Sequence, residues 1–299
     1  MKSKELRGSL LLLLTACIWG CAFVAQSVGA GLVGALTFQT VRSLLGGCAL
    51  VPVLLIRRAY RRRHGTYQKM TKAAWKTLLI AGFCCGTALC ASSLFQQFGI
   101  AYTSVGNAGF ITAMYILIVP IFGLFLGKTV NARHWGCVAI AIAALYLLSV
   151  KDGFVVSAGD ILMLCCAVGF SVQILLVDYF SAKVDAVSLA CTQFFVAGLW
   201  PMIPMFIFDK PTVSATMSAA IPLLYTGLMS SGVAYTLQII GQKYSRPAVA
   251  SLVMSLESVF AVLAGAVLLH QIPTLRESIG CMLMVVAIIA AQLPSKNKA

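Results

Sequence analysis

Apolar runs of about 20 residues recur along this 299-residue chain, and each can cross a hydrocarbon core about 30 Å thick. The chain is 60% apolar and 10% charged, whereas soluble domains carry about 25% charged residues. The sequence therefore predicts an all-α integral membrane protein that crosses the bilayer many times.

Ten transmembrane helices are expected, and their connections are short except for the segment from Arg57 to Lys76. The expected spans are Gly8–Val28, Leu36–Ile56, Trp75–Phe98, Thr103–Leu126, His134–Val150, Gly159–Val177, Val187–Phe208, Ala219–Ile240, Ala248–Leu269 and Ser278–Leu293.

Lysine and arginine are divided unequally between the connections. The formal net charge is +14, and the run Arg57–His64 (RRAYRRRH) is strongly basic, whereas the opposite side receives only Lys151, Lys210 and Arg276. Basic residues collect in cytoplasmic loops. The asymmetry predicts a multi-pass protein of the plasma membrane with cytoplasmic N- and C-termini, which requires an even number of spans. It also accounts for the basic run without a nucleic-acid partner.

The stretch from Gln96 to Leu126 is repeated 142 residues later in the sequence. Each half holds five spans, and an odd number reverses the direction of the second copy. The sequence therefore predicts two inverted five-helix repeats, residues 1–150 and 151–299, around a central cavity, an arrangement that supports transport by alternating access. The matching residues are Gln96, Gly99, Tyr102, Thr103, Ala108 and Leu126 with Gln238, Gly241, Tyr244, Ser245, Ala250 and Leu268, and, at an offset of 151, Gly8 and Ala16 with Gly159 and Ala167.

Two formal charges lie well inside the expected spans, Arg42 in the second and Glu257 in the ninth. Each costs about 2.5–3.5 kcal/mol at a helix centre on insertion scales, so each needs protein or water around it and a partner. One interpretation is a structural ion pair between the two spans. The other places one or both in a cavity, where they contact substrate or, for Glu257, carry a proton.

Further polar and aromatic residues accompany these charges in the spans. In the register of the repeat, Tyr115 corresponds to Glu257 and Gln96 to Gln238. For any single one of these residues, a hydrogen bond between helices is a sufficient explanation. Taken together, they fit a polar cavity. The candidate cavity residues are Trp19, Arg42, Gln96, Asn107, Tyr115, Gln173, Gln193, Tyr235, Gln238, Ser255 and Glu257.

Other signals point away from cofactors and catalysis. The eleven cysteines fall in apolar segments with no Cys-x-x-Cys motif, so they are interpreted as small buried residues and not as disulfides or metal ligands. No cofactor or metal is expected. Glycine pairs at four-residue spacing, Gly82/Gly86 and Gly123/Gly127, permit close helix packing or a homodimer, and Pro120 and Pro222 are candidate kinks.

Several short motifs accompany the duplicated five-span layout: Ala16–Gly20 (ACIWG), Arg42, Tyr102–Ser104 leading into Asn107–Ile111, Pro120 and Ser255–Val259 (SLESV). With these features the chain resembles the EamA-like group of the drug/metabolite transporter superfamily over nearly its whole length. The resemblance implies two EamA repeats packed as a basket around a central cavity, and movement of amino acids, other small metabolites or drugs, often outward, without ATP. Such repeats carry an acidic residue just after spans four and nine, where this chain has Lys128 and His270, so a role for that acid does not transfer.

The predicted function is a secondary transporter that exports a small polar metabolite, such as an amino acid, by alternating access. One cation and one anion within the spans suit a zwitterionic substrate. The alternative within this class is a multidrug transporter for lipophilic cations. A membrane-embedded enzyme acting on lipid-linked substrates would need a catalytic set near one membrane face. Asp152 and Asp160 on the outside, with Asp178 and Asp185 on the inside, are instead interpreted as solvated loop charges.

Overall fold

The computed structural model describes residues 2–102, 105–149, 157–268 and 273–292, which form helices joined by turns, with no strand among them. Lys151, Asp152 and His270 lie outside these residues. The elements are α1 (Lys2–Ala30), α2 (Ala35–Arg63), α3 (Lys72–Gly99), α4 (Val105–Thr112), α5 (Tyr115–Phe125), α6 (Ala132–Ser149), α7 (Ala158–Ser181), α8 (Ala186–Pro204), the π-helix η1 (Met205–Asp209), α9 (Val213–Ser218), α10 (Ala220–Leu224), the π-helix η2 (Tyr225–Ala234), α11 (Tyr235–Gln242), α12 (Pro247–Met254), α13 (Glu257–Leu268) and α14 (Leu275–Gln292).

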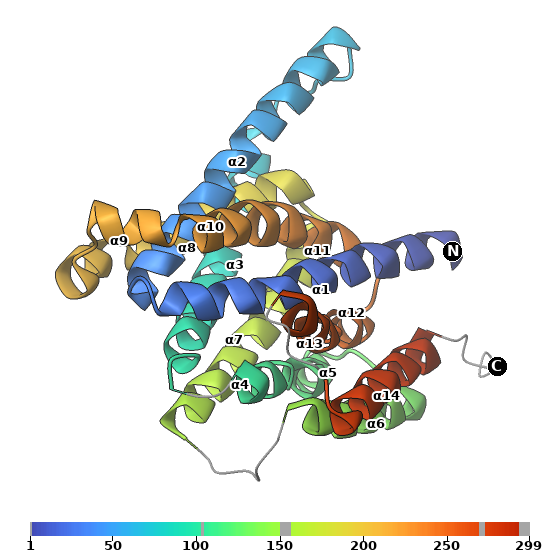
Figure 1. Cartoon of the computed structure of the whole chain (residues 1–299). Helices are drawn as coiled ribbons and strands as arrows, with labels where there is room; N and C mark the ends of the chain where they lie inside the picture. The colour runs from blue at the N-terminus through green and yellow to red at the C-terminus, as the bar shows by residue number, and fades with distance from the viewer. Residues whose placement is uncertain (1, 103–104, 150–156, 269–272, 293–299) are drawn as a thin grey trace.

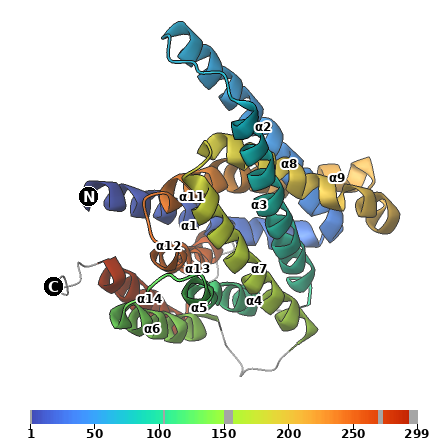
Figure 2. The same cartoon turned by 180° about the vertical axis from the view of Figure 1, so that it is seen from behind.

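The expectation of a multi-pass, all-helical membrane protein is confirmed. Within the described residues, 8 helical segments are long and apolar enough to cross a membrane by length and composition. A shorter apolar helix, Ala132–Leu148, covers the fifth expected span, and α14 covers the tenth. The start of α1 and the end of α14 lie toward the same side of the bundle in both cartoon views (Figures 1 and 2).

Two of the expected spans are interrupted at matching positions. The fourth is divided between α4 and α5 at Ala113–Met114, and the ninth between α12 and α13 at Ser255–Leu256. The backbone tightens in the same way at both places: the N–H of Met114 bonds to Ile111 O (3.1 Å), and that of Leu256 to Val253 O (3.2 Å). Such one-turn departures from α-helical bonding inside a long helix often mark functional positions.

Pro120, a candidate kink, lies within α5, and the interruption of this span comes earlier, at Ala113–Met114. In the eighth expected span, the π-helix η2 begins three residues after Pro222. A proline removes one helical hydrogen bond, but at neither position does the helix end at the proline itself.

The helices of the two halves are interleaved. α1, from the first half, packs against η2, α11, α12 and α13 of the second half, whereas α7, from the second half, packs against α3, α4 and α5 of the first. α2 packs against α8, and α6 against α14. The main hydrophobic core joins both halves through side chains such as Leu12, Ile116, Leu145, Met254 and Met284.

Close packing of α1 on α13 depends on Gly20. A Cβ atom at this position would lie 2.7 Å from the backbone carbonyl carbon of Phe260 and 2.8 Å from the backbone nitrogen of Ala261. Neither backbone atom can move away as a flexible side chain would. We expect Gly20→Ala to lower the free energy of unfolding by about 1–3 kcal/mol, as overpacking does, measured by denaturant titration in detergent. Gly136→Ala is the matched control, because a Cβ at Gly136 has nothing within 4 Å; an equal loss in both variants would contradict this account.

The expected glycine pairs serve different purposes. A Cβ at Gly82 would collide with Thr192, and one at Gly86 would lie 2.6 Å from the carbonyl oxygen of Gln193. This pair therefore packs α3 against α8 within one chain. Gly127 adopts φ 73° just after α5, where the left-handed conformation favours glycine at a helix end.

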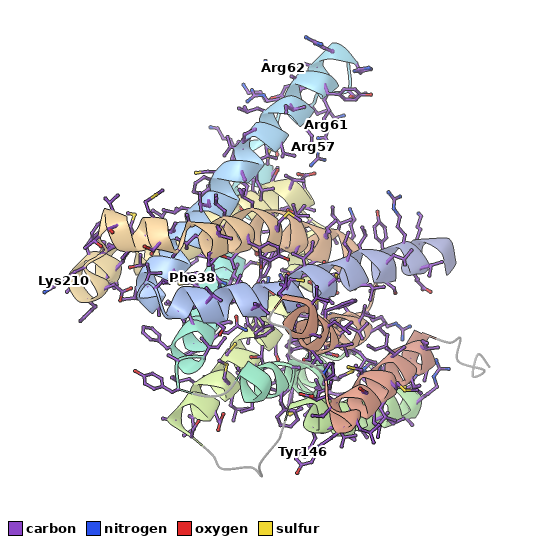
Figure 3. All side chains as sticks on the ribbon, viewed as in Figure 1. Phe38, Arg57, Arg61, Arg62, Tyr146 and Lys210 are labelled. Atoms are coloured by element: carbon purple, nitrogen blue, oxygen red, sulfur yellow. The ribbon has the colours of Figure 1, made fainter. Side chains whose placement is uncertain are left out.

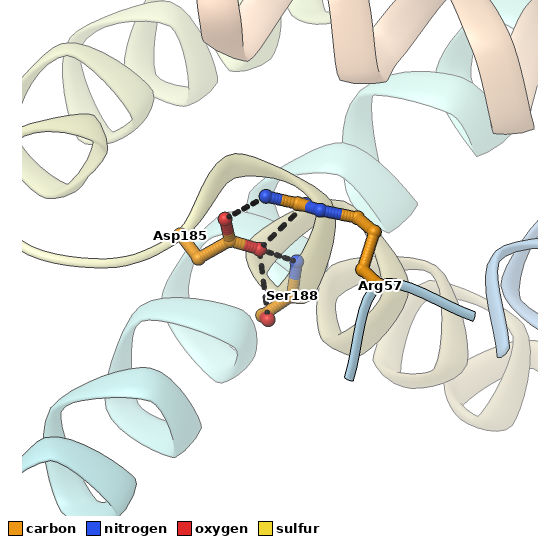
Figure 4. Close-up of polar contacts among 3 residues, drawn as sticks. All are labelled: Arg57, Asp185 and Ser188. Atoms are coloured by element: carbon orange, nitrogen blue, oxygen red, sulfur yellow. Dashed lines mark hydrogen bonds and ion pairs between the residues drawn. The ribbon is translucent and has the colours of Figure 1, made fainter. Parts of the chain in front are cut away.

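Asp160 and Asp178 are not solvated loop charges, whereas Asp185 is exposed in the connection before α8, as predicted. Asp160 is buried and forms a capping box with Ser157 at the start of α7. Asp178 bonds to Lys128, which stands where the family pattern has an acid. Asp185 caps α8 by accepting from the N–H of Ser188 at 3.0 Å, and pairs with Arg57 at 3.0 Å (Figure 4). The prediction was wrong for Asp160, because it belongs to the first turn of α7, and for Asp178, because it lies within α7 and pairs with a lysine from the connection after α5.

Asp185 gives the chain a pH-dependent contact at the end of α2. Burial acts to raise the pKa of its carboxyl, but the N–H of Ser188 and the Arg57 guanidinium outweigh burial and lower the pKa below its ordinary value. The contact therefore stabilises the fold above the ordinary pKa and is lost as the pH falls through the lower pKa of the folded protein. We expect Asp185→Asn to cost less than about 1 kcal/mol at pH 7, because the pair is partly exposed. Thermal unfolding from pH 7 to pH 3 should show the difference from the parent shrinking only at the acidic end.

Candidate functional site

A cavity lies between the two halves at the level of the helix interruptions. The empty volume of the cavity, including its open mouth, is about 470 Å³. The part of this volume that the centre of a water molecule can occupy is about 30 Å³. The cavity is therefore narrow, with room for about two waters. The lining residues come from α1, α2, α3, α4, α5, α7, η2, α11 and α13: Trp19, Ala22, Phe23, Gln26, Arg42, Gln96, Thr112, Tyr115, Phe170, Gln173, Ile174, Ser230, Tyr235, Gln238 and Glu257.

Tyr115 and Glu257 meet in this cavity. The Tyr115 hydroxyl donates a hydrogen bond to Glu257 Oε1 at 3.0 Å, and the two side chains are 3% and 5% exposed. Each is the first residue after its interruption, at the start of α5 and α13 respectively. The partial positive charge at a helix N-terminus favours a carboxylate there. The bond therefore joins corresponding positions of the two halves, 142 residues apart.

Arg42 lines the same cavity without a carboxylate partner. Its Nε donates to Gln39 Oε1 at 2.8 Å and its Nη1 to Gln26 Oε1 at 3.0 Å, and its guanidinium carbon lies 5.9 Å from the ring centroid of Phe38. The side chain is 7% exposed. A buried cation held only by neutral amides keeps an attraction for an anion.

The structure excludes one of the two interpretations of Arg42 and Glu257. The two side chains face one cavity but form no ion pair: Arg42 donates to Gln39 and Gln26, and Glu257 accepts from Tyr115. The interpretation as a structural ion pair is wrong, because each charge has neutral hydrogen-bonding partners nearer to it.

Amide and aromatic groups complete the lining. Gln238 Nε2 donates to Gln173 Oε1 at 3.2 Å, which leaves Gln173 Nε2, Gln238 Oε1 and the indole nitrogen of Trp19 buried without a protein partner. The Trp19 and Tyr235 rings lie 4.7 Å apart between centroids. Buried polar atoms in native proteins are nearly always bonded, so water or a ligand in the cavity is the available partner.

Two matches to a family model divide the chain between them. The EamA-like transporter family model matches residues 6–150 and again residues 157–291. An uncharacterized transporter of Archaeoglobus fulgidus is 30% identical over 291 residues, which is 97% of this chain and 87% of that protein.

The chain belongs to the EamA-like transporter family.

This EamA-like chain is thus a membrane transporter of the drug/metabolite transporter superfamily. Membership of this family indicates transport rather than catalysis. A solved crystal structure of a protein aligns with 95% of this chain and 96% of its own length, with a TM-score of 0.77 at 18% sequence identity. At that identity the likeness concerns the fold alone.

Most of the predicted site residues of this EamA-like chain line the one cavity: Trp19, Arg42, Gln96, Tyr115, Gln173, Tyr235, Gln238 and Glu257. Gln193 does not; it is fully buried beside Gly86 of α3. Ser255 is also absent from the lining, because its hydroxyl bonds to Leu252 O at 2.7 Å and to Met284 Sδ at 3.7 Å. The side chain of Asn107 lies outside the described part of the molecule.

Several lining residues were not predicted, although helical spacing from Trp19 and Gln173 could have found them: Ala22, Phe23, Gln26, Phe170 and Ile174. Trp19, Ala22, Phe23 and Gln26 follow the spacing i, i+3, i+4 and i+7 of one face of α1. At the offset of 151, Trp19, Ala22 and Phe23 correspond to Phe170, Gln173 and Ile174, which also line the cavity. Thr112 and Ser230 gave no distinguishing signal, because hydroxyls are common in membrane helices.

Metal and thiol chemistry find no support at this site. Within the part of the chain that the structure describes, no group of three or more His, Cys, Asp or Glu residues could hold a metal ion. Cys48 and Cys165 are exposed, so the interpretation of every cysteine as buried is wrong for these two.

Proposed function

We propose that this EamA-like protein is a ten-span secondary transporter that exports a small polar metabolite across the plasma membrane by alternating access. The observation that carries the proposal is the Tyr115–Glu257 hydrogen bond, which joins matching interruptions of two helices in one cavity. Interrupted helices in corresponding positions of two halves are the best indicator of a transporter binding site.

Two inverted five-helix repeats, residues 1–150 and 151–299, explain several observations together. The family model matches the chain twice, once in each half. Packing is reciprocal: α1 lies against the ninth expected span, and α7 against the fourth. The lining residues of α1 and α7 also correspond at one offset. With both termini in the cytoplasm, as the basic connections favour, the second repeat runs upside down relative to the first. Rocking one repeat against the other then opens the cavity to each side in turn.

A zwitterionic substrate such as an amino acid fits the charges of the cavity. Arg42 lacks an acidic partner and would bind a carboxylate, while Glu257 and the unpaired amide oxygen of Gln238 would bind an ammonium group. Since the reachable space is only about 30 Å³, the cavity must widen to admit such a molecule, as alternating access requires.

Glu257 is the group best placed to couple transport to protons. It is a carboxyl inside a span, in contact with the cavity and bonded to a neutral tyrosine. Intramembrane carboxyls serve as proton relays in transporters. Protonation would remove its charge and release an ammonium-bearing substrate.

Export of lipophilic cations is the second candidate, because aromatic rings of Trp19, Phe23, Phe170 and Tyr235 line the cavity beside Glu257 and rings attract cations. Arg42 in the same cavity opposes it by charge repulsion. A homodimer is a further candidate arrangement, although Gly82 and Gly86 already pack within one chain.

Substrate binding and flux in one preparation would test the proposal. The purified chain is screened for thermal stabilisation by amino acids, other metabolites and a lipophilic cation such as tetraphenylphosphonium, and each stabilising compound is then assayed for flux in proteoliposomes with and without a pH gradient. We expect a zwitterionic metabolite to stabilise the chain and to move faster with the gradient. If tetraphenylphosphonium were the one compound that stabilised the chain and crossed the membrane, the second candidate would be favoured. If no compound crossed the membrane, transport would be contradicted.

A further inference from the structure

The second helix continues well beyond the membrane span expected for it. The span was expected to end at Ile56, but α2 remains helical to Arg63 and α3 begins at Lys72. Figures 1 and 3 show this end of α2 projecting away from the bundle, with Arg57, Arg61 and Arg62 along it. We name residues 57–76 the basic arm.

The basic arm carries positive charge with almost no compensation. No Asp or Glu occurs between Glu5 and Asp152 in the sequence, and Asp185 reaches Arg57 alone. The other cations of the arm are all exposed: Arg58, Arg61, Arg62, Arg63, Lys69, Lys72 and Lys76.

The arginines are held in a defined arrangement. The guanidinium carbons of Arg58 and Arg62 lie 5.4 and 4.9 Å from the ring centroid of Tyr67. The turn after α2 folds back on the helix, since Gly65 has φ 65° and Thr66 N donates to Arg61 O at 2.9 Å. Stacking on a ring leaves the N–H groups of a guanidinium available for phosphate oxygens.

The depth of the arm matches the headgroup layer of the membrane. Leu55 and Ile56 at its base are 58% and 68% exposed, and Tyr60 and Trp75 are 60% and 51% exposed. Such apolar and aromatic side chains on the outside of a membrane protein face lipid and mark the interface. Arg57–Arg63 extend the helix by about 10 Å at 1.5 Å per residue, enough to cross the polar layer of one leaflet.

We propose that the basic arm binds the phosphates of anionic phospholipids in the leaflet from which it emerges. Charge complementarity, stacked guanidinium groups and headgroup depth all fit this occupant. A cluster of cations directly beside a span attracts anionic lipid within a Debye length of the surface.

A lipid titration of the full chain tests this proposal. Parent protein in neutral detergent receives either phosphatidylglycerol or phosphatidylcholine, and the thermal unfolding midpoint and the number of bound lipids, by native mass spectrometry, are recorded. We expect phosphatidylglycerol to bind and to raise the midpoint by about 5 °C at saturation. Phosphatidylcholine should have little effect, and 500 mM NaCl should reduce the gain.

Two variants with equal charge removal separate the arm from general electrostatics. R58Q/R61Q/R62Q/R63Q should bind phosphatidylglycerol at least about tenfold more weakly. The control K4Q/R7Q/K243Q/R246Q removes two cations from the start of α1 and two from the connection between α11 and α12, and it should bind like the parent. The proposal would be overturned if both variants lost affinity equally, or if the arm variant lost none. It would also be overturned if phosphatidylcholine bound as well as phosphatidylglycerol, or if a duplex RNA at equal phosphate concentration displaced the lipid. None of these results depends on the transport assay.

Discussion

Replacing Glu257 with glutamine should reduce substrate flux in proteoliposomes by about a hundredfold. The amide has nearly the same shape and can still accept the hydrogen bond that Tyr115 donates at 3.0 Å, so packing should be preserved. What the variant loses is the charge and the proton, and a hydrogen bond to a charged group contributes about 1.5–3 kcal/mol. Flux that remains should no longer respond to a pH gradient, because the variant has no carboxyl at this position.

Two further variants make the Glu257 prediction specific. Tyr115→Phe removes the hydroxyl but keeps the carboxylate, so flux should fall less than in Glu257→Gln and should still respond to the gradient. Ser255→Ala lies two residues before Glu257 and outside the cavity lining, so it should transport like the parent. If Glu257→Gln transported normally with an intact pH response, neither substrate binding nor proton coupling could be assigned to this residue.

Replacing Arg42 with glutamine should also reduce flux by about a hundredfold, but through a different step. Arg42 holds a positive charge in the cavity with only Gln26 and Gln39 as hydrogen-bonding partners. Removing it takes away the group proposed to bind the substrate carboxylate, so the apparent affinity should weaken while the response to a pH gradient persists. The readouts are the concentration dependence of flux and the thermal stabilisation by substrate.

The repeat supplies a matched control for Arg42. Gln193 occupies the corresponding position in the second half but is fully buried away from the cavity lining. Gln193→Met keeps similar volume and removes an amide whose nitrogen and oxygen both lack a partner in the structure, so it should leave flux unchanged. Equal transport by Arg42→Gln and the parent would contradict the assignment, as would an equal loss in Gln193→Met.

Several features of the fold could be predicted because they depend on local composition and periodicity. The apolar runs predicted the multi-pass helical protein, and the long run of basic residues marked the connection between α2 and α3. The interruptions of the fourth and ninth expected spans were not predicted. Proline was the available signal for a departure from regular helix, and the interruption instead occurs at Ala113–Met114, two residue types that are good helix formers. The change of backbone bonding there depends on helix packing.

The sequence by itself determined the membrane class, the internal correspondence of Tyr115 with Glu257, and most of the polar residues that face the cavity. These follow from which side chains are apolar and from their spacing along one chain. Only the tertiary structure decided that Tyr115 and Glu257 touch, that Arg42 and Glu257 do not pair, and that Gln193 and Ser255 face away from the cavity. Such contacts depend on how helices far apart in the sequence rotate and approach one another, and the rotation of each helix about its axis decides whether a buried side chain meets the cavity or a neighbouring helix.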